Sequence, residues 1–447
     1  MGTRPSRRTS TMFSRTALAL VLLFAAIADA DNPDSSKHVG VATCAGSTCH
    51  GSSRPISNSP VRQDEYFIWQ QKDGHQNAFK LLLKPAARRI ADNLGIKDAS
   101  KAAECLTCHS DYVPEAQRGP HFSLSEGVGC EACHGGAKNW LGPHVSGNSH
   151  AQNIAQGLIP LEDPTVRAKL CLDCHLGSAS KPINHRVMGA GHPPLEFELA
   201  FNTLIQPAHF KVDADYRKRK NFAASGTVWA TGQLVSGQFL LDGLNSERMT
   251  ANGLTPELVF FECSSCHHAM RPPRWNAGLG GHQDPGQLRI ADASLVLSSL
   301  ILRTLDLPSS RAWDAALKQL HEGSRQSVPA IRSAAADLRK LTDTALGELR
   351  GKTLGKTELL KLINALATAG GGKLAGDFTM AKQVYYGLDA LSSHLQTETQ
   401  LPETVFAKPV REVFDAVDDS QRPYDPERLR KALESIKATA AEQSASS

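Results

Sequence analysis

Five pairs of cysteines, each followed immediately by a histidine, constrain this chain more than any other feature. All of them lie between positions 44 and 267 of a 447-residue sequence. In four pairs two residues separate the cysteines, and in the first pair four residues do. The cysteines are Cys44 and Cys49, Cys105 and Cys108, Cys130 and Cys133, Cys171 and Cys174, and Cys263 and Cys266; the histidines are His50, His109, His134, His175 and His267.

This pattern predicts covalent attachment of haem c at five places. The two thiols form thioether bonds with the vinyl groups of a haem, and the adjacent imidazole becomes the proximal iron ligand. The wider spacing between Cys44 and Cys49 needs a longer loop, and we expect Gly46 to let that loop turn tightly. The ten cysteines are therefore the predicted thioether positions, and the five histidines that follow them are the predicted proximal ligands.

Other uses of paired cysteines explain the pattern less well. Disulfides suit an exported chain with an even cysteine count, and zinc sites can be built from two such pairs. Neither requires a histidine after every pair. Iron–sulfur clusters use cysteines in fours, and ten is not a multiple of four.

Twelve further histidines could supply a second axial ligand, because the chain has 17 in all. A second imidazole makes the iron six-coordinate, which suits electron transfer, whereas an open position suits substrate chemistry. We expect His121 and His268 to point away from iron, and for His38 and His282 both roles stay open. The distal candidates are His75, His144, His150, His185, His192 and His209.

The first thirty residues have the pattern of a secretory signal peptide. A basic stretch precedes the apolar run from Ala17 to Ala28, and Ala28-Asp29-Ala30 is a typical cleavage site. Export would place the protein in the periplasm.

No later stretch is apolar over the roughly 18 residues that a spanning helix needs, so we expect no membrane span after cleavage. The formal charge of +4 gives no support to nucleic-acid binding.

The region after residue 285 has a different character. It lacks cysteine, is rich in alanine and leucine, and has helical periodicity, which predicts an antiparallel helical bundle. Ser309 or Ser310 can cap one helix, and Pro426 marks the first turn of another. The expected domains are a signal peptide (1–30), a pentahaem cytochrome c domain (31–285), a helical C-terminal region (286–442) and a disordered tail (443–447).

Several stretches between residues 38 and 285 resemble the multihaem c-type cytochromes typified by the cytochrome c-554 electron carrier, which share haem packing with the hydroxylamine oxidoreductases. This resemblance implies a mainly α fold with few strands and many loops, and stacked haems with mostly bis-histidine ligation. It also implies that His75 and His192 are distal ligands. This chain departs from the family in having five motifs rather than four, which leaves the pairing of ligands to haems open. The resembling stretches are Val39-Gly40, Trp69 with His75 and Ala78, residues 105–109, residues 127–135, Trp140 with His144, and residues 185–199.

The expected function is therefore that of a periplasmic carrier with five haem c groups. Its partners would be redox proteins, either other cytochromes or a quinol-oxidising enzyme. The alternative is a multihaem reductase or oxidase that acts on a small nitrogen or sulfur compound at one five-coordinate haem. No Cys-x-x-Cys-Lys motif of the kind used by pentahaem nitrite reductases is present, which favours the carrier.

A basic run, Arg217-Lys218-Arg219-Lys220, stands out in the middle of the chain. It could be a solvated loop, a docking patch for an acidic partner, or a set of hydrogen-bond donors to haem propionates.

Overall fold

The computed structural model describes residues 1–2, 37–57, 59, 61–250, 256–267, 288–350, 352–418 and 424–445. Within these residues the chain is helical, and its strand-like pairing is limited to two isolated bridges, His38 with Arg118 and Phe261 with Ile290. The predicted mainly α class is therefore confirmed. Nearly all of the predicted signal peptide lies outside the described residues, as do His268 and His282.

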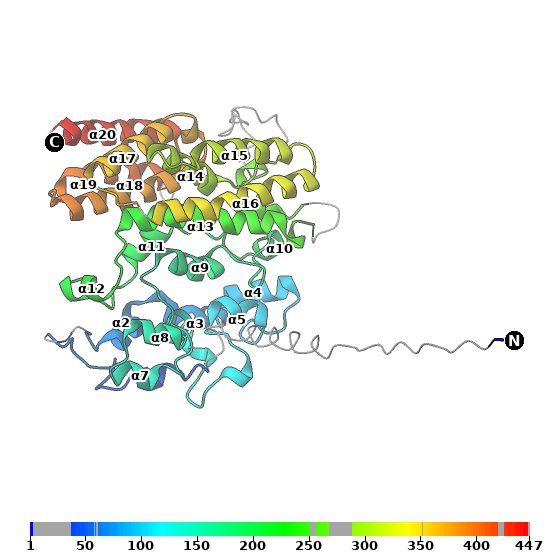
Figure 1. The fold of residues 1–447 in the computed structure, drawn as a ribbon, viewed down its shortest axis with the longest axis vertical. Helices are drawn as coiled ribbons and strands as arrows, with labels where there is room; N and C mark the ends of the chain where they lie inside the picture. The colour runs from blue at the N-terminus through cyan, green and yellow to red at the C-terminus, as the bar shows by residue number, and fades with distance from the viewer. Residues whose placement is uncertain are drawn as a thin grey trace.

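Figure 1 shows two regions stacked on one another, one built from short helices and loops and the other from long helices. The short helices belong to the N-terminal half of the chain, where glycine and proline interrupt the sequence. They are α1 (Val41–Cys44), α2 (Glu65–Lys72), α3 (Ala78–Leu82), α4 (Pro85–Leu94), α5 (Ala103–His109), α6 (Cys130–His134), α7 (Leu141–Val145), α8 (His150–Ala155), α9 (Pro164–His175), α10 (His185–Gly189), α11 (Leu199–Ile205) and α12 (Ala214–Arg219), with 3₁₀ turns at Gly74–Asn77, Glu115–Gln117 and Leu124–Glu126.

The long helices form the C-terminal bundle. Helix α15 begins where the sequence predicted, with Ser309 at the N-cap position, although the Ser309 hydroxyl donates to Glu348 rather than to the helix. Helix α20 begins at Pro426, as the sequence predicted, and α17 ends at Gly371 within a run of three glycines. The helices are α13 (Ser225–Asn245), α14 (Ala293–Thr304), α15 (Ser310–Ser324), α16 (Val328–Arg350), α17 (Lys356–Gly371), α18 (Phe378–Thr399), α19 (Thr404–Val417) and α20 (Pro426–Ala445), with 3₁₀ turns at Glu247–Thr250, Leu258–Phe260, Cys263–Ser265 and Lys373–Gly376.

Helix α13 belongs to this bundle although it precedes residue 286, and it lies on the face of the bundle that meets the N-terminal region (Figure 1). It packs against α16, α14 and α18 on one side and against α9 and α11 of the N-terminal region on the other. Its apolar side chains are buried on all sides, as expected for a helix enclosed by other helices. The bundle therefore begins earlier in the chain than the sequence-based boundary at 285, and α13 joins the two regions.

The two regions differ in how much apolar core they contain. One continuous cluster runs through the bundle and includes Trp229, Trp313 and Phe406. The N-terminal region has only small clusters in its described residues, one around Leu82 and Leu106 and one around Val187. An N-terminal region with so little protein core needs another source of buried apolar surface, and large covalently held cofactors would supply it.

The end of the chain differs from the expectation. Helix α20 continues to Ala445, so residues 443–445, which we expected to be disordered, are helical. Alanine dominates this last stretch and has the highest helix propensity, which lets the helix extend.

Candidate functional site

Three cysteine pairs lie on short helices of the N-terminal region, the first begins at the end of α1, and the fifth begins in the 3₁₀ turn Cys263–Ser265. Helices α5, α6 and α9 each end on the histidine of a motif, with both cysteines inside the helix. Residues three and four apart on a helix share one face, so two thiols and the following imidazole point the same way. Every cysteine is free of disulfide bonds. The local structure therefore leaves the thiols available for thioether formation.

The first motif turns differently from the expectation. A side chain at Gly46 would meet only the Cys49 side chain at 3.5 Å, an ordinary contact. A side chain at Gly51 would lie 2.0 Å from the Ala45 carbonyl oxygen. Gly51, whose N–H donates to the Gly46 carbonyl at 2.9 Å, is thus the residue that the tight loop requires.

Each motif histidine faces a second histidine from elsewhere in the chain. The distances between imidazole ring centroids in these five pairs fall in a narrow range, from 6.1 to 6.4 Å. Two imidazoles that bind one metal ion through nitrogens about 2 Å from it have ring centroids about 6 Å apart. The pairs are His50 with His144, His175 with His75, His109 with His192, His134 with His209, and His267 with His185.

Hydrogen bonds at Nδ1 orient several of these rings. His75 Nδ1 donates to Asp73 at 2.8 Å and His50 Nδ1 to Glu65 at 3.1 Å. His109, His192 and His144 donate through Nδ1 to backbone carbonyl oxygens, those of Ala78, Pro193 and Leu141. A hydrogen bond at Nδ1 leaves Nε2 as the free nitrogen, which is the usual arrangement of a metal-ligating histidine.

Burial keeps several rings in the uncharged form that binds metals. Together with a smaller effect of the facing imidazole, it lowers the pKa of His134 to about 4 and that of His175 to about 4. Carboxylates act in the opposite direction at two sites. The hydrogen bond that His75 donates to Asp73 raises the pKa of His75, and the one that His50 donates to Glu65 raises the pKa of His50.

Two thiol contacts bring different motifs together. The Cys44 and Cys130 thiols lie close enough to shift each other's pKa, and so do the Cys108 and Cys174 thiols. The first motif therefore meets the third, and the second meets the fourth. Phe197 stacks on His175 with ring centroids 4.4 Å apart and covers one side of the fourth motif.

The other histidines have different surroundings. His150, a distal candidate, is outside the five pairs, and its Nε2 bonds Glu162. His38 is buried and its Nδ1 bonds Asp111 at 2.8 Å. His321 bonds Asp292, and His394 is buried in the bundle. Five of the six distal candidates therefore face a motif histidine, and the sixth does not.

Sequence reasoning did not single out the acidic residues that hold the motifs in place. Buried Glu131, inside the third motif, accepts backbone N–H groups of Val39, Gly40 and Ala137 at 2.7–2.8 Å. It thereby ties the segment just before α1 to that motif. Asp73 could have been found from its position two residues before His75, where a short polar side chain can reach the imidazole.

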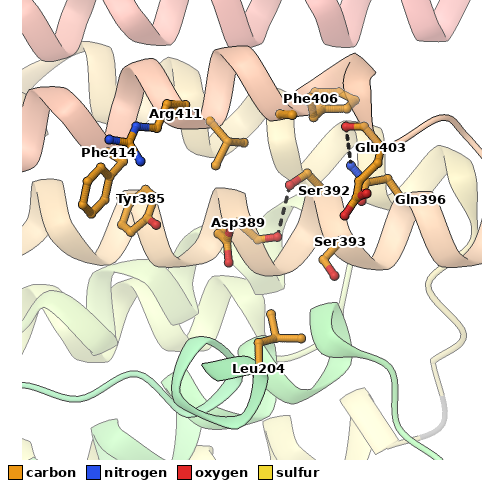
Figure 2. A pocket seen from close by; sticks show the side chains of 12 residues that line it. Leu204, Tyr385, Asp389, Ser392, Ser393, Gln396, Glu403, Phe406, Arg411 and Phe414 are labelled. Carbon is orange, nitrogen blue, oxygen red and sulfur yellow. Dashed lines mark hydrogen bonds between the residues drawn. The ribbon is translucent and has the colours of Figure 1, made fainter. Parts of the chain in front are cut away.

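A separate pocket of about 470 Å³ lies in the bundle between α18 and α19, with Leu204 of α11 at its edge (Figure 2). Tyr385, Phe406 and Phe414 give it aromatic walls, and burial raises the pKa of Asp389 within it. None of the residues that line it is a cysteine or a histidine. The pocket is therefore distinct from the imidazole pairs.

Free thiol pairs on helical turns with adjoining imidazoles are a donor set that fits haem c, and proteins that carry it are c-type cytochromes. The comparison with known families gives the same class. Residues 43–135 match the model of the family Cytochrome c554 and c-prime. Residues 43–135 are thus similar to a cytochrome c554-family domain, and this similarity implies a haem c protein of electron transfer.

The matched stretch contains the first three motifs and His75. No curated protein and no solved structure matches the chain. Among the described residues, no helix combines the length and the apolar character needed to cross a membrane.

Proposed function

We propose that this protein is a pentahaem c-type cytochrome that carries electrons between redox proteins. The observation that carries this proposal is the set of five imidazole pairs, each joining a motif histidine to a second histidine at 6.1–6.4 Å. In this proposal the ten motif cysteines are the thioether positions. The axial ligand sets are His50 and His144, His109 and His192, His134 and His209, His175 and His75, and His267 and His185.

Haem c, when bound, supplies one-electron chemistry through iron. The residues of this chain would hold each iron between two imidazoles, an arrangement that would change little with oxidation state. Hydrogen bonds at Nδ1 fix the rings, and the carboxylates of Asp73 and Glu65 make two of them more electron-donating.

The thiol contacts support a route for electrons within the molecule. Groups attached at Cys44 and Cys130 would lie close together, as would groups attached at Cys108 and Cys174. Short separations of this kind are what a multihaem carrier needs. Within the fifth site, the backbone N–H of His185 donates to the Glu257 carboxylate at 2.9 Å, which ties this proposed ligand to the segment that precedes Cys263.

The reductase or oxidase alternative requires one iron with an open position. All five motif histidines have a facing imidazole, so no open position is supported at any of them. The carrier is therefore the function that we propose.

Location and domain organisation belong to the same proposal. Residues 1–30 would direct export to the periplasm, where haem is attached to c-type cytochromes. Residues 31–285 would hold the five haems, with the helical region after them as a scaffold. Because α13 of the haem-binding part is enclosed by the bundle, the two parts would fold together.

The haem content of the purified protein tests the stoichiometry. We expect a pyridine haemochrome spectrum with a c-type band and an intact mass equal to the mature chain plus five haems. The cleavage site is read from the same mass. A protein without a c-type band, or with fewer than five haems after full maturation, would refute the pentahaem proposal.

A further inference from the structure

Residues 204–222 form an unusual surface between α11 and α13, and they include α12, which Figure 1 shows at the edge of the molecule. We call this segment the docking segment. Of the twelve large apolar side chains that are exposed in the described part of the chain, five lie within these nineteen residues. They are Leu204, Ile205, Phe210, Val212 and Phe222.

The docking segment is also basic. It contains five cationic and two acidic side chains, an excess of three positive charges. Arg219 pairs with Asp215, but within the described residues none of the other cations forms an ion pair with a carboxylate. Those unpaired cations are Lys211, Arg217, Lys218 and Lys220.

The basic run divides into an inner and an outer part. Lys220 is half-buried, its pKa is lowered by burial, and its charge acts on His134, so it lies on the inner side. Arg217 and Lys218 are exposed. The Arg217 guanidinium lies over the Phe222 ring at 4.1 Å, which places a cation and an exposed aromatic ring side by side.

The docking segment covers one imidazole pair. His209, which faces His134, belongs to the segment itself. The exposed ring of Phe210 lies edge-on to His209 at 5.7 Å and stacks on Tyr216 at 5.7 Å. A partner that touches Phe210 is therefore one residue away from an axial ligand in the proposed third haem site.

We propose that the docking segment binds an acidic electron-transfer protein and is the place where electrons enter or leave at the His134 and His209 site. This inference rests on the proposed function. Exposed apolar groups ringed by like charges suit a transient complex, because the charges steer the encounter and the apolar centre excludes water. A membrane surface would also attract these groups, but it would gain nothing from their position over a ligand pair, whereas electron transfer requires a short separation.

Binding to an acidic monohaem cytochrome c tests the proposal, with a basic monohaem cytochrome c as the control probe. We expect the haem-loaded protein to bind the acidic probe at low ionic strength, and its affinity to fall as salt is added. The double variant R217E/K218E should bind about tenfold more weakly, and its affinity should depend less on salt. F210A should release the probe faster. K361E, which reverses an exposed charge on α17 in the bundle, should bind like the wild type.

Equal binding of wild type and R217E/K218E would overturn the proposal, as would preference for the basic probe. Retention on phosphatidylglycerol vesicles without binding to the acidic probe would also overturn it and would assign the segment to a membrane surface. Haem content and visible spectra are recorded for each variant. If the pentahaem proposal is wrong, the wild type itself has fewer than five haems or an altered spectrum. If only the docking proposal is wrong, the wild type has five haems and the expected spectrum.

Discussion

Asp73 shows how one residue can tune a proposed ligand. Its carboxylate accepts a hydrogen bond from His75 Nδ1 at 2.8 Å and also contacts Gln206. The interaction with His75 helps hold the pKa of Asp73 at about 2, so the carboxylate is charged at neutral pH and makes the imidazole a stronger donor to ferric iron.

Replacing Asp73 with asparagine should therefore raise the midpoint potential of one haem. We expect a shift of about 50 mV, because a tenfold change in the relative affinity for two one-electron states corresponds to about 59 mV. Spectroelectrochemical titration measures it. D98N is the matched control, since Asp98 is partly exposed and interacts with Ser100 and Lys101 rather than with a histidine. Identical titrations for D73N and wild type would contradict this role.

His209 and His150 offer a direct test of the ligand assignment, because both were sequence candidates and only His209 faces a motif histidine. H209M should convert one haem to a methionine-ligated or high-spin form, with a changed near-infrared charge-transfer band. H150M should leave the haem spectra as in the wild type. The assignment would fail if H150M changed the spectra and H209M did not.

At the scale of single elements, close helix crossings in the bundle depend on glycine. A side chain at Gly387 of α18 would lie 2.7 Å from Leu366 of α17 and 2.9 Å from the indole of Trp229 of α13. By contrast, a Cβ atom added at Gly347 of α16 would have no neighbouring atom within 4 Å. Both glycines are inside helices, so alanine improves helix propensity equally at the two sites.

We expect G387A to destabilise the protein by about 2 kcal/mol, since overpacking a core commonly costs 1–3 kcal/mol. G347A should instead stabilise it by up to about 1 kcal/mol. Denaturant unfolding followed by far-ultraviolet circular dichroism gives both values. An increase in stability for G387A would show that α18 does not cross α13 and α17 this closely.

Particular elements show what the sequence could and could not predict. The spacing of the motifs predicted their positions and the direction of their imidazoles, since these depend only on one helical turn. The spacing did not predict which second histidine faces each motif histidine. His175 and His75, for example, are 100 residues apart in the sequence and meet only in the folded chain. Gly51 was missed for the same reason: its need for glycine comes from an approach to Ala45 that spacing does not reveal.

At the scale of the whole molecule, α13 determines how the chain can be divided. Its residues face α16 and α18 of the bundle, and Gln238 donates to Thr342 and Asp343 across that interface. A sequence-based boundary at 285 separates these partners. The apolar character of α13 was visible in the sequence, but its place between the N-terminal region and the bundle depends on helices that follow much later in the chain.

A fragment that ends at residue 285 should therefore not accumulate as a folded haem protein. Loss of the bundle exposes the buried face of α13, including Trp229 and Leu241, which the fragment cannot cover. Soluble yield and haem content after expression in a host that matures c-type cytochromes are the measurements. A chain that lacks only residues 446–447 is the control. A soluble fragment with five haems would show that the N-terminal part is an independent domain.

Electron paramagnetic resonance of the fully oxidised protein, with the spins counted per chain, tests the central claim most directly. Five irons held between imidazole pairs predict five low-spin ferric haems and no high-spin signal. The angles between facing rings differ, from 9° for His50 and His144 to 90° for His134 and His209, so we expect more than one class of low-spin signal. A high-spin haem, or fewer than five haems in total, would contradict the account.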